Sequence, residues 1–332
     1  MAIPGSVPVW IVSVRKTGHL NQCRALVTAL GTEPERTLLI DGKAAADRQA
    51  RKLALRLLTP WQVLRALLSN RLPRRLVVIS SGRAPLALCR IWRRLRRDRL
   101  FVVQVGMPRR GADVADILVA SRHQGAAGED GDGSGADAPG TIIVDGVLAR
   151  PPAALTAIAE RAPAPRHIAM LVGGKNVTFD YDGPRFRRAL EKLAALRTEA
   201  EVSVVFSRRT YPRTAALIRA RLADLGIAFI EVGDREGFAS TMAGATHLVV
   251  CPDSITMISE CCASGRPVFV PGMDVLRPGH ENARFIQQFI EAGYALPFDA
   301  FAWEAETRPL GDEAARIAPR ILHCLEDWVS CG

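Results

Sequence analysis

One segment in the C-terminal half, residues 246–270, constrains the fold more than any other part of the chain. It runs from an apolar β-type stretch (246–250) through a polar turn at Asp253-Ser254 and a short helical stretch to a second apolar run at 268–270. Strand, turn, helix and strand in this order form the repeating unit of a parallel α/β sheet. Ligands of such sheets bind outside the carboxyl ends of the strands, where the next helix begins.

The turn in this segment predicts an anion site. Ser254 is placed to cap the helix and Thr256 to lie in its first turn, so hydroxyls and free backbone N–H groups would converge on a phosphate oxygen. Glu260 follows one to two turns later, and its carboxylate is suited to accept hydrogen bonds from a ribose diol. The pattern indicates a nucleoside-diphosphate pocket. An ordinary capped helix with a solvated Glu260 fits the same spacing and is the alternative.

Length and cysteine usage narrow the class of protein. A chain of 332 residues exceeds the usual size of one domain, so two domains are expected, each with its own core. Seven cysteines, an odd number scattered through a chain of this size, suit a reducing compartment better than a disulfide framework. The adjacent Cys261 and Cys262 have no CxxC or HxxxH partner pattern and are interpreted as buried packing residues rather than metal ligands. We find no run of about 18 uninterrupted apolar residues and no basic-then-apolar leader. The sequence therefore predicts a cytoplasmic protein.

The net charge of +10 is concentrated in the N-terminal half, where residues 1–150 hold 24 Lys and Arg against 12 Asp and Glu. Two segments, 51–75 and 83–99, supply much of this excess, and the second interleaves arginines with Leu, Ile and Trp. Such a surface suits anionic lipid headgroups or a charged substrate, so peripheral attachment to the inner face of the cytoplasmic membrane is expected. Solvated arginines are the alternative. No nucleic-acid-binding motif is present, so nucleic acid is not an expected partner.

Apolar β-type runs alternate with helical stretches through both halves, which predicts a parallel sheet in each half. Besides the two runs described above, the expected strands are 7–14, 76–80, 100–105 and 116–120 in the first half and 167–172, 201–206 and 228–232 in the second. A first helix is expected over 22–30, after a glycine-containing turn. Because every polar turn follows a strand, two sheets that face each other across a central cleft would gather these turns around one cavity.

The domain organisation follows from composition. Residues 124–140 hold Gly, Ala and Asp but no large apolar side chain, and are expected to form a mobile surface loop. A Pro- and Ala-rich stretch then predicts a linker at 162–166, between an N-terminal domain (1–161) and a C-terminal domain (167–310). We expect residues 311–332 to form a C-terminal helix that packs back on the N-terminal domain. The patterns GxGxxG and GxxxxGK[ST] do not follow these strands, so neither an NAD-binding domain nor a P-loop ATPase is supported.

Taken together, the motifs resemble the mitochondrial-fission ELM (elongated mitochondria) family, over nearly the whole chain. The motifs that carry the resemblance are Gly173-Gly174, Ser207-Arg208-Arg209-Thr210, Asp253-Ser254-x-x-Met257-x-Ser259-Glu260, Gly265-x-Pro267-Val268, Gly18-His19-x-Asn21-Gln22 and Gly293-x-Ala295-x-Pro297-Phe298. Two features depart from the family pattern. The loop 124–140 looks like an insertion, and Glu236-Gly237-Phe238 stands where the family usually has an Asn-Pro pair before an aromatic residue.

The resemblance implies a fold and a donor site. The family is similar in fold to the GT-B glycosyltransferases, which have two Rossmann-like domains, among them the N-acetylglucosaminyltransferase of lipid II synthesis and lipid-A-disaccharide synthase. The donor is then a nucleotide sugar, a substrate rather than a cofactor, with Arg208 neutralising phosphate charge as the leaving group departs. Helix amides and arginine carrying that charge make a metal unnecessary. The implied nucleotide- and diphosphate-binding residues are Gly173, Gly174, Ser207, Arg208, Asp253, Ser254, Thr256, Met257 and Glu260.

The resemblance also implies an acceptor side in the N-terminal domain. His19 would face the acceptor as a general base, because an imidazole near its unperturbed pKa takes a hydroxyl proton at neutral pH. The residues expected around it are Gly18, Asn21, Gln22, Ser81 and Arg83. The implied function is glycosyl transfer to an envelope or lipid-linked acceptor. A non-catalytic nucleotide-binding or recruitment protein is the alternative, with His19 stabilising a turn and Arg208 forming surface ion pairs.

Overall fold

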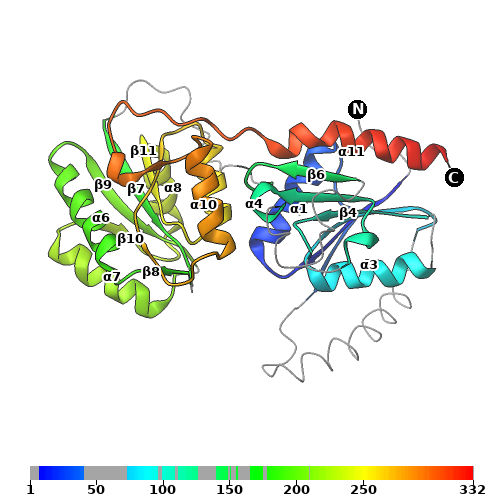
Figure 1. Ribbon diagram of the computed structural model, residues 1–332, viewed down its shortest axis with the longest axis horizontal. Coiled ribbons are helices and arrows are strands. Elements are labelled where there is room, and N and C mark those ends of the chain that lie inside the picture. Colours follow the sequence, from blue (N-terminus) through cyan, green and yellow to red (C-terminus); the bar gives the residue numbers. More distant parts are fainter. Residues whose placement is uncertain are drawn as a thin grey trace. The chain divides into compact units, whose positions relative to one another are not determined.

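The computed structural model describes residues 7–40, 73–95, 99–108, 111–125, 140–148, 150, 155, 165–174, 178–208 and 210–331 (Figure 1). The chain forms two compact units, unit 1 (1–149 and 312–332) and unit 2 (150–311). The division falls ahead of the boundary expected at residue 161, and the expected linker lies mainly outside the described residues. The basic segment 51–75 and the loop 124–140 also lie largely outside them.

Unit 1 is built on a six-stranded, wholly parallel sheet in the order β2-β1-β3-β4-β5-β6. Nearly every residue of its inner strands is buried, as expected where helices cover both faces of a parallel sheet. The strands are β1 (Val9–Val14), β2 (Arg36–Ile40), β3 (Leu76–Ser81), β4 (Leu100–Val105), β5 (Ile117–Ser121) and β6 (Thr141–Val144).

Alternate residues of these strands belong to two separate cores. Ile11 and Ile79 face helices α1 (Thr17–Ala29) and α11 (Glu313–Ser330). Their neighbours face α3 (Arg83–Leu95), where the rings of Trp10 and Trp92 meet edge to face at 6.0 Å. A short helix, α4 (Arg122–Gly125), and a 3-10 turn, Ala112–Val114, also belong to unit 1. Successive side chains of a strand point to opposite faces of the sheet, so each inner strand contributes apolar residues to both cores.

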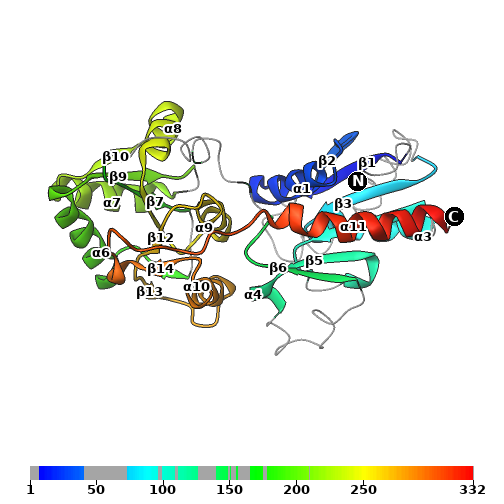
Figure 2. The same cartoon turned by 90° about the horizontal axis from the view of Figure 1, so that it is seen from above.

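The C-terminal helix α11 is an integral part of unit 1 and lies beside α1 (Figure 2). Its apolar stripe, with Ile317, Ile321 and Leu325 buried, packs against the first core. Asp312 caps its start, and the buried Glu313 ties its first turn to the end of β6, because Glu313 Oε2 accepts a hydrogen bond from Asp145 N at 2.8 Å. A segment distant in sequence therefore closes the face of the sheet that α1 leaves open.

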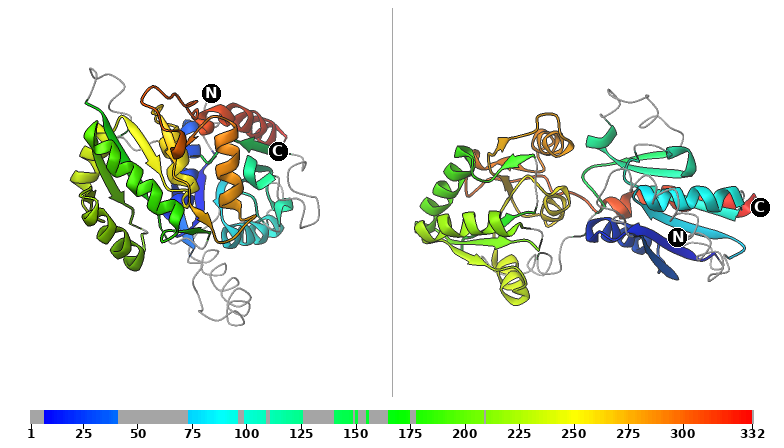
Figure 3. Two further views of the ribbon diagram at one scale, coloured as in Figure 1. Left: turned by 60° about the vertical axis from the view of Figure 1, so that its left-hand side comes forward. Right: turned by 90° about the horizontal axis from the view of Figure 1, so that it is seen from below.

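Unit 2 repeats this architecture with a parallel sheet in the order β10-β9-β7-β11-β12-β14. Helices α6 (Pro184–Ala195) and α7 (Pro212–Asp224) cover one face, and α8 (Arg235–Gly244), α9 (Ile255–Cys262) and α10 (Glu281–Glu291) the other (Figure 3). The strands are β7 (His167–Val172), β9 (Glu201–Phe206), β10 (Ala228–Ile230), β11 (His247–Val250), β12 (Val268–Val270) and β14 (Leu296–Pro297).

A two-stranded antiparallel ribbon and two short 3-10 turns also belong to unit 2. Strand β8 (Phe179–Asp180) pairs with β13 (Asp274–Val275), so the chain that follows the glycine pair 173–174 is joined to the chain that leads into α10. The 3-10 turns are Leu196–Thr198 and Phe298–Ala300. No helix among the described residues is long and apolar enough to cross a membrane.

The expected fold class is confirmed, while several local predictions were wrong. Strands β4, β7, β9 and β12 match the expected bounds, but β2, β6 and β14 were not predicted. Helix α1 begins at Thr17 rather than residue 22, so His19 lies in a helix and not in a glycine turn. Gly18 costs a helix only about 1 kcal/mol relative to Ala. Burial of Cys23 and Leu26 against the sheet outweighs that cost.

Candidate functional site

Each sheet has one point where consecutive connections leave in opposite directions. In unit 1 the chain passes from β1 to β2 on one side and then to β3 on the other. In unit 2 it passes from β7 through β9 to β10, and then returns to place β11 on the other side of β7. Open α/β sheets bind ligands at such switch points, outside the carboxyl ends of the strands. The switch points here lie between β1 and β3 and between β7 and β11.

His19 and Ser81 meet at the switch point of unit 1. His19 lies in the first turn of α1, which follows β1, and its Nδ1 is 2.8 Å from the Oγ of Ser81, the last residue of β3. The Ser81 hydroxyl donates in turn to the carbonyl oxygen of Val105, at the end of β4, at 3.0 Å. Ser81 is buried and His19 is half-buried. One line of polar atoms therefore joins the ends of three neighbouring strands.

Burial lowers the pKa of His19, and the positive charge of Lys16 lowers it further. The imidazole is therefore neutral at pH 7 and carries one unprotonated ring nitrogen. A neutral imidazole in the first turn of the helix that follows β1 is able to accept a proton from a substrate hydroxyl.

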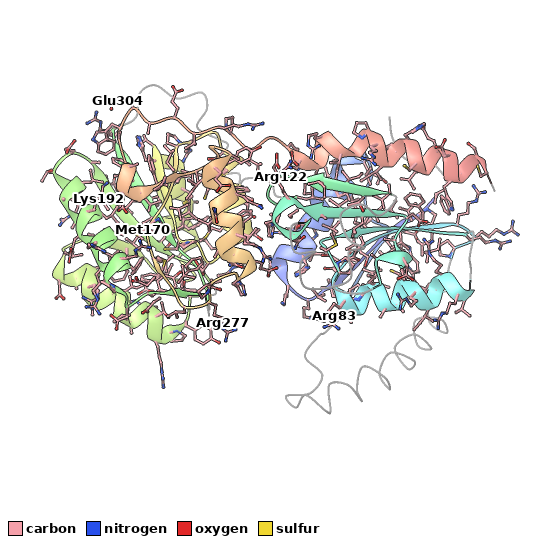
Figure 4. All side chains as sticks on the ribbon, in the orientation of Figure 1. Arg83, Arg122, Met170, Lys192, Arg277 and Glu304 are labelled. Carbon is pink, nitrogen blue, oxygen red and sulfur yellow. The ribbon has the colours of Figure 1, made fainter. Side chains whose placement is uncertain are left out.

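The other residues expected on the acceptor side have different surroundings. Gln22 Nε2 donates to the carbonyl oxygen of Gly18 at 3.3 Å, within α1. Asn21, on the same helix, is exposed. Arg83 is the exposed first residue of α3 (Figure 4). The structure thus brings His19 and Ser81 into contact and leaves Asn21 and Arg83 open to solvent.

Gly173 and Asp253 meet at the switch point of unit 2. A Cβ at residue 173 would overlap the Asp253 carboxylate, so only glycine allows this approach. Tyr181 Oη donates to Asp253 Oδ1 at 2.9 Å, and Asn282 Nδ2 donates to the Asp253 carbonyl oxygen at 2.9 Å. Burial raises the pKa of Tyr181 well above its usual value, with Cys251 and Asp253 adding to the effect, so the phenol stays a donor.

Thr210 fastens the ends of β7 and β9 to each other. Its Oγ1 donates to the Gly173 carbonyl oxygen at 2.6 Å and accepts from Ser207 N at 3.0 Å. Arg208, in the same turn, is exposed and forms no ion pair within the part of the chain that the structure describes. A guanidinium at a strand end with no acidic partner is available to a phosphate.

Helix α9 begins directly after this cluster. Ser254 is its N-cap, 4% exposed, and its Oγ accepts from Met257 N at 3.4 Å. Thr256 lies in the first turn and Glu260 near the second, both half-buried. The predicted capping role of Ser254 is therefore observed. The helix presents its N-terminal amides at the carboxyl end of β11, the position where helices bind phosphate.

Three residues of the unit 2 cluster were not among the predicted site residues: Tyr181, Thr210 and Asn282. Thr210 stood in the Ser207–Thr210 motif, and its hydroxyl at a strand end was a usable signal. No local sequence signal pointed to Tyr181 or Asn282, because they are 72 and 29 residues from Asp253 along the chain. The residues that depart from the family pattern, Glu236-Gly237-Phe238, form the first turn of α8, where Asp234 caps Gly237 N at 2.8 Å.

The basic helix α3 is partly neutralised. Arg90 pairs with Asp113 at 2.8 Å, and Arg93 pairs with Asp116. Arg94 and Arg83 are exposed. The helix therefore presents less net positive charge than its sequence indicates.

Comparison with known proteins places the chain in a family. A model described as "Mitochondrial fission ELM1" matches residues 17–325. The Mitochondrial fission protein ELM1 of Arabidopsis thaliana is 24% identical over 285 residues, which is 74% of this chain and 63% of that protein. The chain therefore spans less than two thirds of the length of this curated relative.

Solved structures share the fold at low sequence identity. UDP-GlcNAc 2-epimerase from Methanocaldococcus jannaschii superposes with a TM-score of 0.53 at 13% identity, covering 96% of this chain and 100% of that one. The S. aureus MnaA-UDP co-structure has a TM-score of 0.52 at 13% identity, covering 98% of this chain and 97% of that one. A glycosyltransferase from Rickettsia africae has a TM-score of 0.50 at 11% identity, covering 98% of this chain and 94% of that one. These structures confirm the two-unit, GT-B-like α/β fold, and the family match settles the relationship: the chain belongs to the mitochondrial fission ELM1 family.

Proposed function

We propose that this protein is a glycosyltransferase that binds a nucleotide sugar in unit 2 and transfers the sugar, without a metal ion, to an envelope or lipid-linked acceptor. The observation that carries the proposal is the start of α9, capped by Ser254, at the switch point beside Gly173. This is where α/β sheets bind nucleotides.

Different residues of unit 2 would bind the diphosphate, the ribose and the sugar of the donor. The Thr256 amide and the Ser254 hydroxyl would hold the diphosphate at the positive end of α9, and Met257, whose amide donates to Ser254 Oγ, would keep that hydroxyl in place. Glu260 would accept hydrogen bonds from the ribose. Gly173, Gly174 and Ser207 would border the diphosphate, and Arg208 would balance its growing charge as the sugar leaves. Asp253 would border the sugar rather than the phosphate, because its carboxylate repels phosphate oxygens.

Unit 1 would supply the base. A hydroxyl of the acceptor attacks the anomeric carbon, the bond from that carbon to the diphosphate breaks, and the nucleoside diphosphate leaves with the electron pair. His19 would take the hydroxyl proton, since its lowered pKa keeps it neutral at pH 7. Gly18, Asn21, Gln22 and Arg83 would line the acceptor side around it.

The choice of the first donors to test follows from the structural neighbours. One of them carries UDP in its structure, and another is a UDP-GlcNAc 2-epimerase. We therefore propose a uridine diphosphate sugar as donor. The test is titration calorimetry of the full chain with UDP, GDP, ADP and the corresponding sugars. Binding of one nucleoside diphosphate supports the proposal. Absence of binding by all of them at millimolar concentration contradicts it.

The alternative function is that of a binding or recruitment protein, and it is favoured by the curated relative, which is described as a mitochondrial fission protein. Under this alternative the fold binds a nucleotide or a partner protein and catalyses nothing. The two functions differ in one measurement: product formation by the purified chain with a donor that demonstrably binds and a lipid extract as acceptor. Turnover supports the enzyme. Binding without turnover across donors and acceptors supports the recruitment protein.

A further inference from the structure

The hydrogen bonds around Ser81 determine which nitrogen of His19 carries the proton. The Ser81 hydroxyl has one hydrogen, and the Val105 carbonyl oxygen, 3.0 Å away, can only accept. If Ser81 donates to Val105, its Oγ accepts at its lone pairs, and the His19 Nδ1 at 2.8 Å must be the donor. In a neutral imidazole the remaining nitrogen, Nε2, is then unprotonated.

The opposite arrangement forms fewer hydrogen bonds. If Ser81 donated to His19 Nδ1, the Val105 carbonyl oxygen would lose its bond to Ser81, and the side-chain donor left to it among the described residues would be Gln104 Nε2, at the longer distance of 3.3 Å. A buried carbonyl that loses a good partner costs about 1–3 kcal/mol. Val105 is 2% exposed, so water does not compensate for that loss. The chain of Nδ1–H to Ser81 and Ser81 to Val105 is therefore the more stable one.

Nε2 is the nitrogen left for a substrate. It makes no hydrogen bond with any residue that the structure describes, and His19 is half-buried at the carboxyl edge of the sheet. The buried hydroxyl holds the ring from the protein side through Nδ1. The lone pair of Nε2, on the far side of the ring, points away from that anchor.

We propose that Ser81 is a positioning residue, which acts through His19 rather than on the acceptor, and that it fixes the tautomer whose Nε2 takes the substrate proton. This inference rests on the proposed base function of His19 and revises the expected place of Ser81 among the acceptor-side residues. After proton transfer, both ring nitrogens of His19 carry hydrogen, and Nδ1–H still donates to Ser81. The hydrogen-bond chain therefore accommodates the base before and after the transfer without rearrangement.

The test reads the tautomer directly, by long-range proton–nitrogen NMR of the full chain with labelled histidine at pH 7.5. The chain has six histidines, and the signal lost in His19→Gln identifies residue 19. We expect a protonated Nδ1 and an unprotonated Nε2 in the wild type. In Ser81→Ala the ring should shift towards the Nε2–H form that free imidazole side chains prefer in water. Ser81→Thr, which keeps the hydroxyl, should retain the wild-type pattern.

Ser80→Ala is the matched control. Ser80 is also a buried serine of β3, but successive residues of a strand point to opposite faces, so it faces α3 and not His19. It should leave the His19 signals unchanged. An Nε2–H wild type, or a Ser81→Ala protein that keeps the wild-type pattern, overturns the inference. Because this readout needs no turnover, it decides the role of Ser81 even if the proposed transfer reaction fails.

A second arm uses activity where transfer is detected. Ser81→Ala should lower kcat about 10- to 100-fold while KM for the donor stays within about twofold, because the base is mispositioned and the donor site is untouched. Ser81→Thr should recover the wild-type kcat to within about threefold. A Ser81→Ala protein with the wild-type kcat and an altered KM for the acceptor would show that Ser81 binds the acceptor, against the inference.

Discussion

The Asp253 carboxylate lies against Gly173 so closely that the two residues leave no room for a Cβ at position 173. They lie in the turns that follow β7 and β11, which are neighbours in the sheet and far apart in sequence. Tyr181 holds the carboxylate and Asn282 holds the backbone of the same aspartate. The site in unit 2 is thus a contact between two strand ends, fixed from two further elements.

The first prediction follows from that contact. Gly173→Ala should destabilise unit 2 by about 1–3 kcal/mol, because the new methyl group must displace Asp253 or the loop that carries it. Chemical unfolding monitored by circular dichroism measures the change in the free energy of unfolding. Gly272→Ala is the control, since its Cβ would meet nothing nearer than Asp299 at 3.7 Å. Equal stability of the two variants would contradict the close approach.

Glu260 tests the donor site. Glu260→Ala should weaken binding of the nucleoside diphosphate by about 1–3 kcal/mol, through loss of charge-assisted hydrogen bonds to the ribose. Titration calorimetry with the donor found in the screen gives the affinity. Glu191 lies on the exposed face of α6, away from the site, so Glu191→Ala removes an equivalent charge and should leave the affinity for the nucleoside diphosphate unchanged. Wild-type affinity in a folded Glu260→Ala protein would refute the ribose assignment.

His19 separates proton transfer from donor binding. His19→Ala should lower turnover by roughly 10² to 10⁴, because the acceptor hydroxyl loses its base, while calorimetry finds the donor affinity unchanged. His323, on α11, has 73% of its side chain exposed and provides the control variant, which should keep full turnover. Undiminished turnover in His19→Ala would transfer the role of base to another group.

The pH dependence of stability should reflect three histidines whose pKa burial lowers: His19 of unit 1, and His167 and His247 of unit 2. The pKa of each lies below the ordinary value of 6.5. The unfolded chain therefore binds protons first as the pH falls, so the free energy of unfolding should be constant above about pH 6.5 and decline below it. Urea unfolding at pH 7.5, 6.5 and 5.5 measures the decline.

His247→Gln should make that decline shallower, because it removes one of the three groups. The glutamine amide can still donate to the Trp303 carbonyl oxygen, which His247 Nε2 contacts at 3.1 Å. A decline of unchanged slope in this variant would assign the effect to other groups.

Membrane attachment is the last prediction. Because Arg90 and Arg93 are paired with aspartates, the exposed Arg83 and Arg94 should carry the attraction of α3 for anionic lipid. At about 1 kcal/mol for each arginine, Arg83→Ala with Arg94→Ala should weaken sedimentation with anionic vesicles about 10- to 30-fold at low salt.

A double variant of Arg185 and Arg188, exposed on α6, controls for net charge alone. Equal sedimentation of the wild type with neutral and anionic vesicles would remove the membrane from the proposed function.

The sequence by itself determined the fold class, the inner strands and the capped start of α9. These depend on local signals: runs of apolar β-branched residues long enough for a buried strand, and a serine placed to cap the helix after one of them. The short or half-exposed outer strands β2, β6 and β14 carry weaker signals of this kind, and they were missed.

Tertiary structure decided the rest. The start of α1 was set by packing against the sheet rather than by its glycine. Arg90 and Arg93 were neutralised by aspartates that lie 23 residues away. Ser81 became the partner of His19, and Tyr181 and Asn282 became the supports of Asp253, because strand order brings together residues that the chain separates by 29 to 72 positions. A hydrogen bond depends on that proximity in space, and local sequence patterns do not contain it.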